Sequence, residues 1–268
     1  MYQFPIGVML ESFRLPTPEA VKKAAEVGAK GIQMYSTNGE HAPENMTPAK
    51  CAELLDMLKS YGLRFSALCG DLGHGFGNAE KNPQLIEDSK RILELAKELE
   101  TDIVTTHIGV VPADPNHERY KIMQDACGEL AAYADSMKAH FAIETGPETS
   151  LTLKGFLDTL HSTGVAVNLD PANLIVYGKA NPIDALDVFG AYVRGVHAKD
   201  GLYPTNGKEL GNEVKVGDGK ANFPALLKGL KEHGFDGSLT IEREITGEQQ
   251  TKDIIETRDY LNNLIASL

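Results

Sequence analysis

Short runs of β-type residues recur along the whole chain, separated by stretches with helical spacing. Within the runs, bulky apolar residues alternate with small or polar ones, which is the two-residue period of a strand. The stretches between them have the periodicity of amphipathic helices. The strand-like runs cover residues 6–10, 31–36, 64–70, 102–109, 140–146, 165–170, 193–200 and 238–244.

Capping and stop signals flank the helical stretches. Thr17 and Thr47 each precede a proline, which predicts a capping residue followed by proline at the first helical position. Asn82-Pro83 and Asn222-Phe223-Pro224 are predicted to open two further helices. Glycines follow several of the stretches, as expected where a helix ends in the left-handed conformation. These glycines are Gly28, Gly62, Gly164 and Gly234.

Strand–helix alternation of this kind predicts parallel strands joined by right-handed crossovers. Eight repeats in 268 residues fit a (β/α)8 barrel better than an open doubly wound sheet. An open sheet would more often carry a glycine-rich phosphate loop after its first strand, and residues 6–16 contain none. No shift of composition marks a second domain. The prediction is an α/β fold, a single TIM-barrel domain over residues 1–268.

Two of the predicted loops are longer than a barrel requires. They cover residues 71–82, after the third strand-like run, and residues 201–221, after the seventh. Both follow the carboxyl ends of strands, the face where barrel active sites are built, so we expect lids or pocket walls. The second loop contains GDGK at 217–220, for which a tight turn into a helix is favoured over a phosphate cradle.

Composition and charge narrow the class of protein. The chain is 42% apolar and 24% charged, as in ordinary globular domains, and its net charge of -12 argues against a nucleic-acid partner. Three cysteines, without metal-ligand spacing, predict free thiols in a cytoplasmic protein. Residues 1–10 lack the basic region of a signal peptide, and no apolar run is long enough to span a membrane. The expected location is therefore the cytoplasm.

Four polar residues stand at the ends of four consecutive strand-like runs: Glu144, Asp170, His197 and Glu242. Each shares its side of the run with small or polar residues, while bulky apolar residues take the other side. A barrel interior is a packed apolar core, so inward-facing acids need a partner there. Three converging carboxylates would repel one another unless a cation lay among them. The pattern predicts a metal site formed by all four residues.

The ligand types also indicate which metal and which chemistry to expect. Three oxygen ligands and one nitrogen suit an octahedral divalent ion, with Mn²⁺ expected and Co²⁺ or Mg²⁺ as alternatives. Zn²⁺ is compatible, although no cysteine or histidine pair favours it. Four protein ligands leave two octahedral positions for adjacent oxygens of a substrate. Such a site predicts Lewis-acid chemistry on a sugar or polyol.

The sequence around these ligands resembles the sugar isomerase and epimerase superfamily with a xylose isomerase-like barrel. The likeness covers nearly the whole chain and is most specific in HAKDG and IERE. In ketose 3-epimerases of this superfamily, the matching glutamate, aspartate, histidine and glutamate bind one divalent metal. The matching motifs are IETG (143–146), NLDPAN (168–173), HAKDG (197–201) and the segment from GDG (217–219) to IERE (241–244).

The resemblance implies that Glu144 and Glu242 exchange a proton with the carbon beside the substrate carbonyl, through a cis-enediolate. Return on the opposite face gives epimerisation, and transfer between neighbouring carbons gives aldose–ketose isomerisation. An alternative on the same barrel is a lyase or dehydratase acting on a keto-sugar or dehydroshikimate-like acid. A third is a sugar-binding barrel without catalysis. The resemblance implies a sugar or sugar-phosphate substrate, and homo-oligomers are common in the superfamily.

Two positions depart from the epimerase pattern. Those enzymes commonly carry a histidine where this chain has Asn173, and an arginine shortly after the metal histidine. Lys199 is the candidate that replaces this arginine in contacting a substrate oxygen. A related branch of three-zinc apurinic-site endonucleases has ligands similar to several residues of this chain. That branch also needs the histidine replaced by Asn173, and the acidic net charge disfavours DNA, so a nuclease is not expected.

Further candidates for the substrate pocket lie beside the predicted ligands. His107 follows the inward side of its run, which leaves open a pocket role or a buried core histidine. His74, in the loop 71–82, is a candidate to line the pocket. Glu148 either contacts substrate or caps the next helix. Glu244 shares the face of Glu242 and is a candidate to bond a neighbouring cation.

Overall fold

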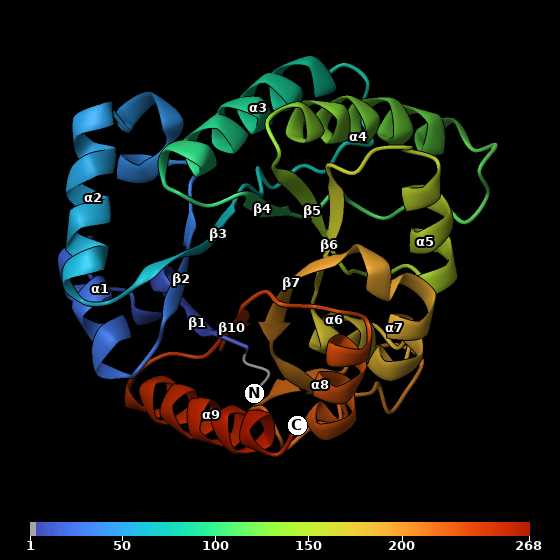
Figure 1. The fold of residues 1–268 in the computed structure, drawn as a ribbon. Coiled ribbons are helices and arrows are strands. Elements are labelled where there is room, and N and C mark those ends of the chain that lie inside the picture. Colours follow the sequence, from blue (N-terminus) through green and yellow to red (C-terminus); the bar gives the residue numbers. More distant parts are fainter. Residues whose placement is uncertain (1–3) are drawn as a thin grey trace.

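A closed barrel of parallel strands forms the centre of the molecule. The computed structural model describes residues 4–268, and its barrel strands pair in the order β1-β10-β7-β6-β5-β4-β3-β2. The helices form a ring around them (Figure 1), so the TIM-barrel prediction is confirmed. The barrel strands are β1 (Ile6–Met9), β2 (Gly31–Tyr35), β3 (Arg64–Cys69), β4 (Ile103–Thr106), β5 (His140–Glu144), β6 (Val165–Leu169), β7 (Val193–Ala198) and β10 (Leu239–Ile241).

The helices lie between the strands along the chain and pack on the outer face of the barrel. The α-helices are α1 (Thr17–Glu26), α2 (Pro48–Ser60), α3 (Asn82–Glu98), α4 (Glu118–Ser136), α5 (Ser150–Asp158), α6 (Pro171–Val176), α7 (Pro182–Phe189), α8 (Phe223–Glu232) and α9 (Glu248–Ala266). The short 3-10 helices are η1 (Leu10–Phe13), η2 (Gly39–His41), η3 (Pro43–Asn45) and η4 (Gly190–Tyr192).

The two predicted threonine caps have different outcomes. Thr47 precedes α2, and its hydroxyl accepts a hydrogen bond from the Lys50 amide, so this cap is confirmed. At α1 the prediction is wrong, because Pro16 is the N-cap and Thr17 is already helical. The Thr17 hydroxyl donates instead to Glu40 at 2.6 Å, a residue that only the folded chain brings near.

Small side chains fill the barrel interior towards the amino ends of the strands. The hydroxyl oxygens of Ser66 in β3 and Thr240 in β10 lie 3.5 Å apart. A Cβ atom at Gly7 in β1 would lie 3.2 Å from the Thr240 hydroxyl oxygen, so the strand there admits little beyond glycine. The interior is therefore packed at this end, and the larger polar residues lie towards the carboxyl ends.

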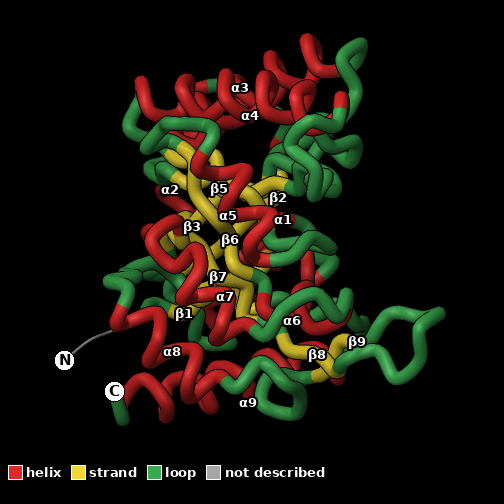
Figure 2. Tube along the Cα trace, turned by 90° about the vertical axis from the view of Figure 1, so that its right-hand side faces the viewer, coloured by secondary structure: helices red, strands yellow, loops and turns green. Residues whose placement is uncertain are grey.

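The long loop after β7 contains a hairpin that the sequence did not predict. Its strands are β8 (Asp200–Leu202) and β9 (Asn212–Val214), which pair antiparallel. The seventh strand-like run was predicted over residues 193–200, but β7 ends at Ala198 and Asp200 already belongs to the hairpin. Figure 2 shows the hairpin and its connecting loop on the side of the molecule opposite the carboxyl-terminal end.

The GDGK segment folds as a turn whose amides are already used. The Asp200 carboxylate accepts hydrogen bonds from the amides of Gly217 (3.0 Å), Gly219 (3.1 Å) and Ala221 (2.9 Å). A Cβ atom at Gly219 would lie 2.1 Å from Asp200 Oδ1, so only glycine lets the turn close on this carboxylate. The aspartate takes the place that an anion would occupy, which supports the turn over the phosphate cradle.

Arg243, just after β10, ties the hairpin to helix α9. Its Nη1 donates to Glu213 of β9 at 2.7 Å, and its Nε donates to Asp253 of α9 at 2.8 Å. Gln249 also donates to Asp253 at 2.8 Å. Although burial would raise the pKa of Asp253, the hydrogen bonds from Gln249 and Arg243 hold that pKa below its ordinary value of 3.8.

Replacing Asp253 with asparagine is expected to destabilise the protein by about 2 kcal/mol at pH 7, because Arg243 loses a charged acceptor. A depressed folded-state pKa contributes stability above pH 3.8 and loses it as the pH falls further. The difference between wild type and Asp253→Asn should therefore shrink as the pH falls below 3.8 and through the lowered folded-state pKa. Urea unfolding at several pH values measures it. Asp259→Asn, on the exposed side of α9, is the matched control, and an equal loss in both variants would contradict the prediction.

Two further sequence expectations concern the cysteines and the membrane. All three cysteines are free thiols, as predicted, and all three are buried. Over residues 4–268, no helix has the length and apolar character needed to cross a membrane. The stretch considered for a signal peptide begins with residues 1–3, which lie outside the described residues.

Candidate metal centre

The four predicted ligands converge at the carboxyl ends of their barrel strands. Glu144 is the last residue of β5, Asp170 directly follows β6, His197 lies near the end of β7 and Glu242 directly follows β10. One ligand atom from each residue lies within 4.8 Å of those of the other three. Glu144, Asp170 and His197 are buried and Glu242 is partly buried. The barrel closure thus brings together exactly the set that strand parity proposed.

The two carboxylate oxygens of Asp170 have different surroundings: one caps a helix and the other accepts no hydrogen bond. It is the N-cap of α6, and its Oδ1 accepts the amide of Asn173 at 3.0 Å. Its backbone is fixed by Thr145, whose hydroxyl bonds both the Asp170 amide and its carbonyl at 2.9 Å. Asp170 Oδ2 is buried without a hydrogen-bond partner. The cap therefore leaves one carboxylate oxygen, which accepts no hydrogen bond, facing the cluster.

His197 presents one ring nitrogen to the carboxylates and the other to a neutral amide. Its Nδ1 lies 3.4 Å from Glu144 Oε1 and 3.3 Å from Glu242 Oε2, and it has no hydrogen-bond partner of good geometry. Its Nε2 lies 3.2 Å from Oε1 of Gln33 in β2. Nδ1 is therefore the nitrogen that faces the cluster.

Two asparagines of the β6–α6 segment hold Glu144. The side-chain amide of Asn168 donates to Glu144 Oε2, and that of Asn173 donates to Glu144 Oε1, both at 3.3 Å. Asn173 also donates to the Thr145 carbonyl at 3.0 Å. Asn173, where the resemblance to epimerases predicted a histidine, thus serves as a donor to a predicted ligand. The sequence indicated Asn168 only through its inward parity beside Asp170.

Lys199 places its ammonium group against three acids of the cluster rim. Its Nζ lies 2.8 Å from Glu244 Oε1, 3.3 Å from Glu242 Oε2 and 3.7 Å from Asp170 Oδ2. Lys199 is 6% exposed, and Glu244 bonds a neighbouring cation as the sequence suggested. The three acids outweigh burial and raise the pKa of Lys199, which keeps the ammonium charged.

A proton on His197 offsets part of the negative charge of the cluster. Burial would lower the pKa of His197, but Glu144 and Glu242 raise it well above 6.5. Burial also raises the pKa of Asp170 to about 6, against the opposing influence of Lys199. The positive charge of protonated His197 reduces the repulsion among the carboxylates, as a bound cation would.

These residues fit a divalent cation. Asp170 Oδ2 and His197 Nδ1 are buried polar atoms without hydrogen-bond partners, which is costly unless something binds them. The distances of 3.3 and 3.4 Å from Nδ1 to the two glutamates are close to the roughly 3 Å between adjacent ligands of an octahedral ion with bonds of about 2.1 Å. The donor set of carboxylate oxygens and one imidazole nitrogen suits Mn²⁺ or Mg²⁺.

His107 lies beside the cluster and is held from behind by an aspartate. It is the first residue after β4, its Nδ1 lies 3.0 Å from Asp71 Oδ2 and its Nε2 lies 3.5 Å from Glu144 Oε1. The hydrogen bond with Asp71 outweighs burial and raises the pKa of His107 to about 9. Its side chain is 49% exposed, so it is not a buried core histidine. His74 is exposed in the same loop as Asp71.

Glu148 does not cap the helix that follows it. Thr149 is the N-cap of α5, and its hydroxyl accepts from the Thr152 amide at 3.2 Å. Glu148 is 8% exposed, accepts the Gly146 amide at 3.3 Å, and has a pKa raised by burial. Of the two roles that the sequence left open, the capping role is therefore wrong.

Two residues that sequence reasoning missed also belong to the surroundings of the cluster. Tyr35 and Cys69 are the last residues of β2 and β3 and pair directly in the sheet. Burial raises the pKa of both, and in each case the charges of Glu144 and Glu242 add to the shift. Both side chains therefore lie within electrostatic reach of the two glutamates. The available signal was their position at a strand's carboxyl end, which the four ligands share.

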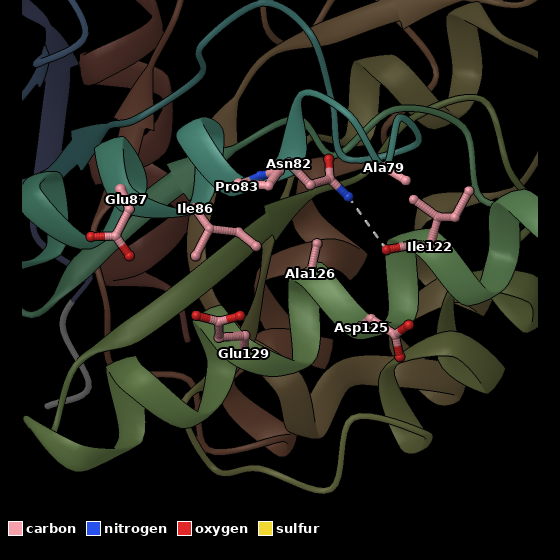
Figure 3. A pocket seen from close by; sticks show the side chains of 9 residues that line it. All are labelled: Ala79, Asn82, Pro83, Ile86, Glu87, Ile122, Asp125, Ala126 and Glu129. Atoms are coloured by element: carbon pink, nitrogen blue, oxygen red, sulfur yellow. Dashed lines mark hydrogen bonds between the residues drawn. The ribbon is translucent and has the colours of Figure 1, made fainter.

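A groove is lined mainly by residues of α3 and α4 (Figure 3). Its lining includes three acids, Glu87, Asp125 and Glu129, and none of the four predicted ligands. Lys90 bonds Glu87 at 3.0 Å and Glu129 at 2.7 Å, so two of these charges are already paired. The groove shows no arrangement suited to the predicted chemistry.

Sequence comparison agrees with the fold. The family model described as a xylose isomerase-like TIM barrel matches residues 21–264. The chain belongs to this family. Among curated proteins, an uncharacterised protein of Methanocaldococcus jannaschii is 24% identical over 231 residues, which are 81% of this chain and 76% of that protein. An inosose dehydratase of Clostridium beijerinckii is 26% identical over 145 residues, which are 48% of each protein.

Solved structures of this barrel family superimpose on nearly the whole chain. A xylose isomerase domain protein from Planctomyces limnophilus has a TM-score of 0.85 and 25% identity, covering 100% of this chain and 99% of that one. A D-tagatose 3-epimerase-like protein has a TM-score of 0.76 and 20% identity, covering 98% and 97%. A Mycobacterium smegmatis protein of the same barrel type, in complex with magnesium, has a TM-score of 0.78 and 16% identity, covering 100% and 99%. The last two likenesses concern the fold alone.

Proposed function

We propose that this chain is a divalent-metal-dependent isomerase or epimerase that moves a proton beside the carbonyl of a ketose, sugar phosphate or related polyol. The observation that carries the proposal is the convergence of Glu144, Asp170, His197 and Glu242 within 4.8 Å at the carboxyl ends of four barrel strands. Membership of the xylose isomerase-like family and a D-tagatose 3-epimerase-like structural neighbour support it. We expect Mn²⁺, with Co²⁺, Mg²⁺ or Zn²⁺ as alternatives.

The two glutamates are the proposed proton carriers. Asp170 is less suited, because one of its oxygens caps α6 and its side chain is 0% exposed. The side chains of Glu144 and Glu242 are 6% and 14% exposed, which lets a carboxylate oxygen reach a substrate C–H bond from the barrel mouth. When bound, a divalent metal would polarise the substrate carbonyl and stabilise the negative charge that develops on its oxygen.

The remaining polar side chains are proposed to orient the substrate. Lys199 presents a charged ammonium group 3.3 Å from Glu242, where it can donate to a substrate oxygen beside that carboxylate. His107 is half exposed and lies next to Glu144, the other proposed proton carrier. The Asp71 carboxylate bonds its Nδ1, which orients the ring and favours its protonated form. His74 and Glu148 remain proposed substrate contacts on the strength of their position near Asp71 and His107 respectively.

Isotope exchange tests the proposed function. The protein loaded with Mn²⁺ is incubated in D2O with a panel of ketoses and ketose phosphates, and proton NMR follows deuterium entering beside each carbonyl. We expect exchange with at least one ketose, together with a new epimer or isomer. Absence of exchange across a wide panel, with the metal shown to be bound in stoichiometric amount, would count against proton transfer.

A lyase or dehydratase is the second candidate. It is favoured by the similarity to the inosose dehydratase of Clostridium beijerinckii, and it would use the same base followed by loss of a leaving group. The same incubations distinguish the two, because elimination produces an unsaturated carbonyl with a new ultraviolet absorbance. A sugar-binding barrel without catalysis would bind ketoses but show neither exchange nor elimination.

A further inference from the structure

A glutamine on the opposite side of the barrel contacts the back of the histidine ligand. Gln33 in β2 is 1% exposed, and its Oε1 lies 3.2 Å from Nε2 of His197 in β7. The other end of the amide, Nε2, donates to the Thr105 hydroxyl of β4 at 2.8 Å. His197 is itself 3% exposed. The contact therefore lies inside the barrel, where neither group can exchange its partner for water.

The Thr105 hydroxyl decides which way the amide of Gln33 faces. This hydroxyl lies 3.5 Å from the Leu68 carbonyl of β3, to which it can donate its proton. Its oxygen is then free to accept from the NH2 group of Gln33. The amide oxygen is consequently turned towards His197. The reversed amide would offer an NH2 group to the imidazole and its oxygen to Thr105, which would leave the Leu68 carbonyl without this donor.

The direction of the amide in turn selects which ring proton His197 keeps when a metal displaces the other. An amide oxygen can only accept, so the imidazole must carry a proton on Nε2 to satisfy it. A neutral ring with its proton on Nε2 has its lone pair on Nδ1, the nitrogen that lies 3.3 to 3.4 Å from the two glutamates. The opposite tautomer would place a proton where the cluster needs a ligand.

We propose that Gln33 is a positioning residue that fixes His197 as the Nε2–H tautomer and so makes Nδ1 its metal-binding atom. The inference rests on the metal centre of the proposed function and does not depend on which sugar is the substrate. A buried amide is costly among apolar neighbours unless both of its ends are bonded. Both ends of Gln33 are bonded, to residues of two other strands, so the amide links the metal ligand to the barrel wall.

Metal affinity of paired variants tests the proposal without relying on activity. Gln33→Met keeps the length and loses both hydrogen bonds, whereas Gln33→Glu keeps an acceptor towards His197. Zn²⁺ affinity is measured by competition with a chromogenic chelator. Loss of an outer-shell partner typically weakens binding about 10–100-fold, which we expect for Gln33→Met. Gln33→Glu should bind within about tenfold of wild type, because a carboxylate also accepts from Nε2–H.

A spectroscopic measurement separates tautomer control from loss of packing. Long-range ¹H–¹⁵N correlation of histidine-labelled, Zn²⁺-loaded protein reports which ring nitrogen of His197 carries the proton. His197→Asn identifies the signal. Wild type and Gln33→Glu should show the Nε2–H form, and Gln33→Met should show a mixture or a weakly bound ring. Ser66→Ala removes a partly buried barrel hydroxyl that bonds the Ile32 carbonyl and not His197, and it should change neither affinity nor tautomer.

The outcomes are separable. Unchanged Zn²⁺ affinity and an unchanged tautomer in Gln33→Met would overturn the inference, as would an equal loss in Gln33→Met and Ser66→Ala. If Gln33→Met does not fold, Thr105→Val replaces it, because the freed amide can then reverse and the same mixture of tautomers is expected. Failure of wild type to bind any divalent metal would instead overturn the proposed function.

Discussion

Replacing Glu242 with glutamine is expected to lower the rate of deuterium incorporation into the substrate by about 10²–10⁴-fold, the usual contribution of a general base. The amide oxygen can still face His197, but an amide cannot take up a proton at neutral pH. The fold should persist, because Glu242 lies at the barrel mouth and Lys199 keeps its contacts with Asp170 and Glu244. Proton NMR in D2O measures the exchange, and elemental analysis shows how much metal the variant retains.

A matched control is available two residues along the chain. Glu244→Gln makes the same chemical change, and Glu244 bonds the same lysine, but its side chain is 60% exposed and it is not in the ligand cluster. Its exchange rate should stay within about tenfold of wild type, since Glu244 is exposed and Lys199 keeps its contacts with Asp170 and Glu242. If Glu242→Gln retained more than a tenth of the wild-type rate with its metal bound, the assignment of Glu242 as a proton carrier would be wrong.

Removing the metal is expected to abolish exchange and to lower the melting temperature. A ligand present at one hundred times its dissociation constant stabilises the folded state by about 2.7 kcal/mol. For a chain of 268 residues, that corresponds to a shift of about 5–10 °C. The physical reason is that three carboxylates and one imidazole lie within reach of a single ion, so binding relieves their mutual repulsion.

Dialysis against a chelator, followed by elemental analysis, calorimetry and addition of Mn²⁺, measures the effect. Exchange and melting temperature should both return when Mn²⁺ is added. Asp170→Asn weakens the ligand set, so its melting temperature should respond much less to chelator and metal. A wild-type protein that keeps its melting temperature and its activity after complete metal removal would exclude a metal-dependent mechanism.

Two residues beside the predicted ligands differ from those expected in ketose 3-epimerases. Asn173, where the resemblance to ketose 3-epimerases predicts a histidine, donates a hydrogen bond to Glu144. Lys199 similarly pairs with Glu242 and Glu244. Asn173 and Lys199, the two positions that depart from the epimerase pattern, therefore contact the two proposed proton carriers. Substrate preference should be determined with a broad panel of ketoses.

The sequence by itself determined the barrel and the four predicted ligands. Strand parity and strand ends are local properties, and parallel strands in a closed barrel all end on one face. A residue at the carboxyl end of its run, on the inward side, therefore has to point towards the barrel mouth. Glu144, Asp170, His197 and Glu242 are therefore expected to meet, and the same rule indicates Tyr35, which shares the side of Gly31 and Gln33. Cys69 shares the side of bulky Phe65, and it pairs with Tyr35 only after a register shift between β2 and β3.

Only the tertiary structure decided which polar groups inside the barrel meet. Gln33 and His197 are 164 residues apart, and their contact depends on the stagger and closure of strands that do not pair with each other. The hydrogen bonds that the amides within residues 217–221 donate to Asp200 likewise form only because the hairpin after β7 folds back. Local periodicity fixes the face that a side chain takes. The partner across the barrel is set by geometry that no single segment contains.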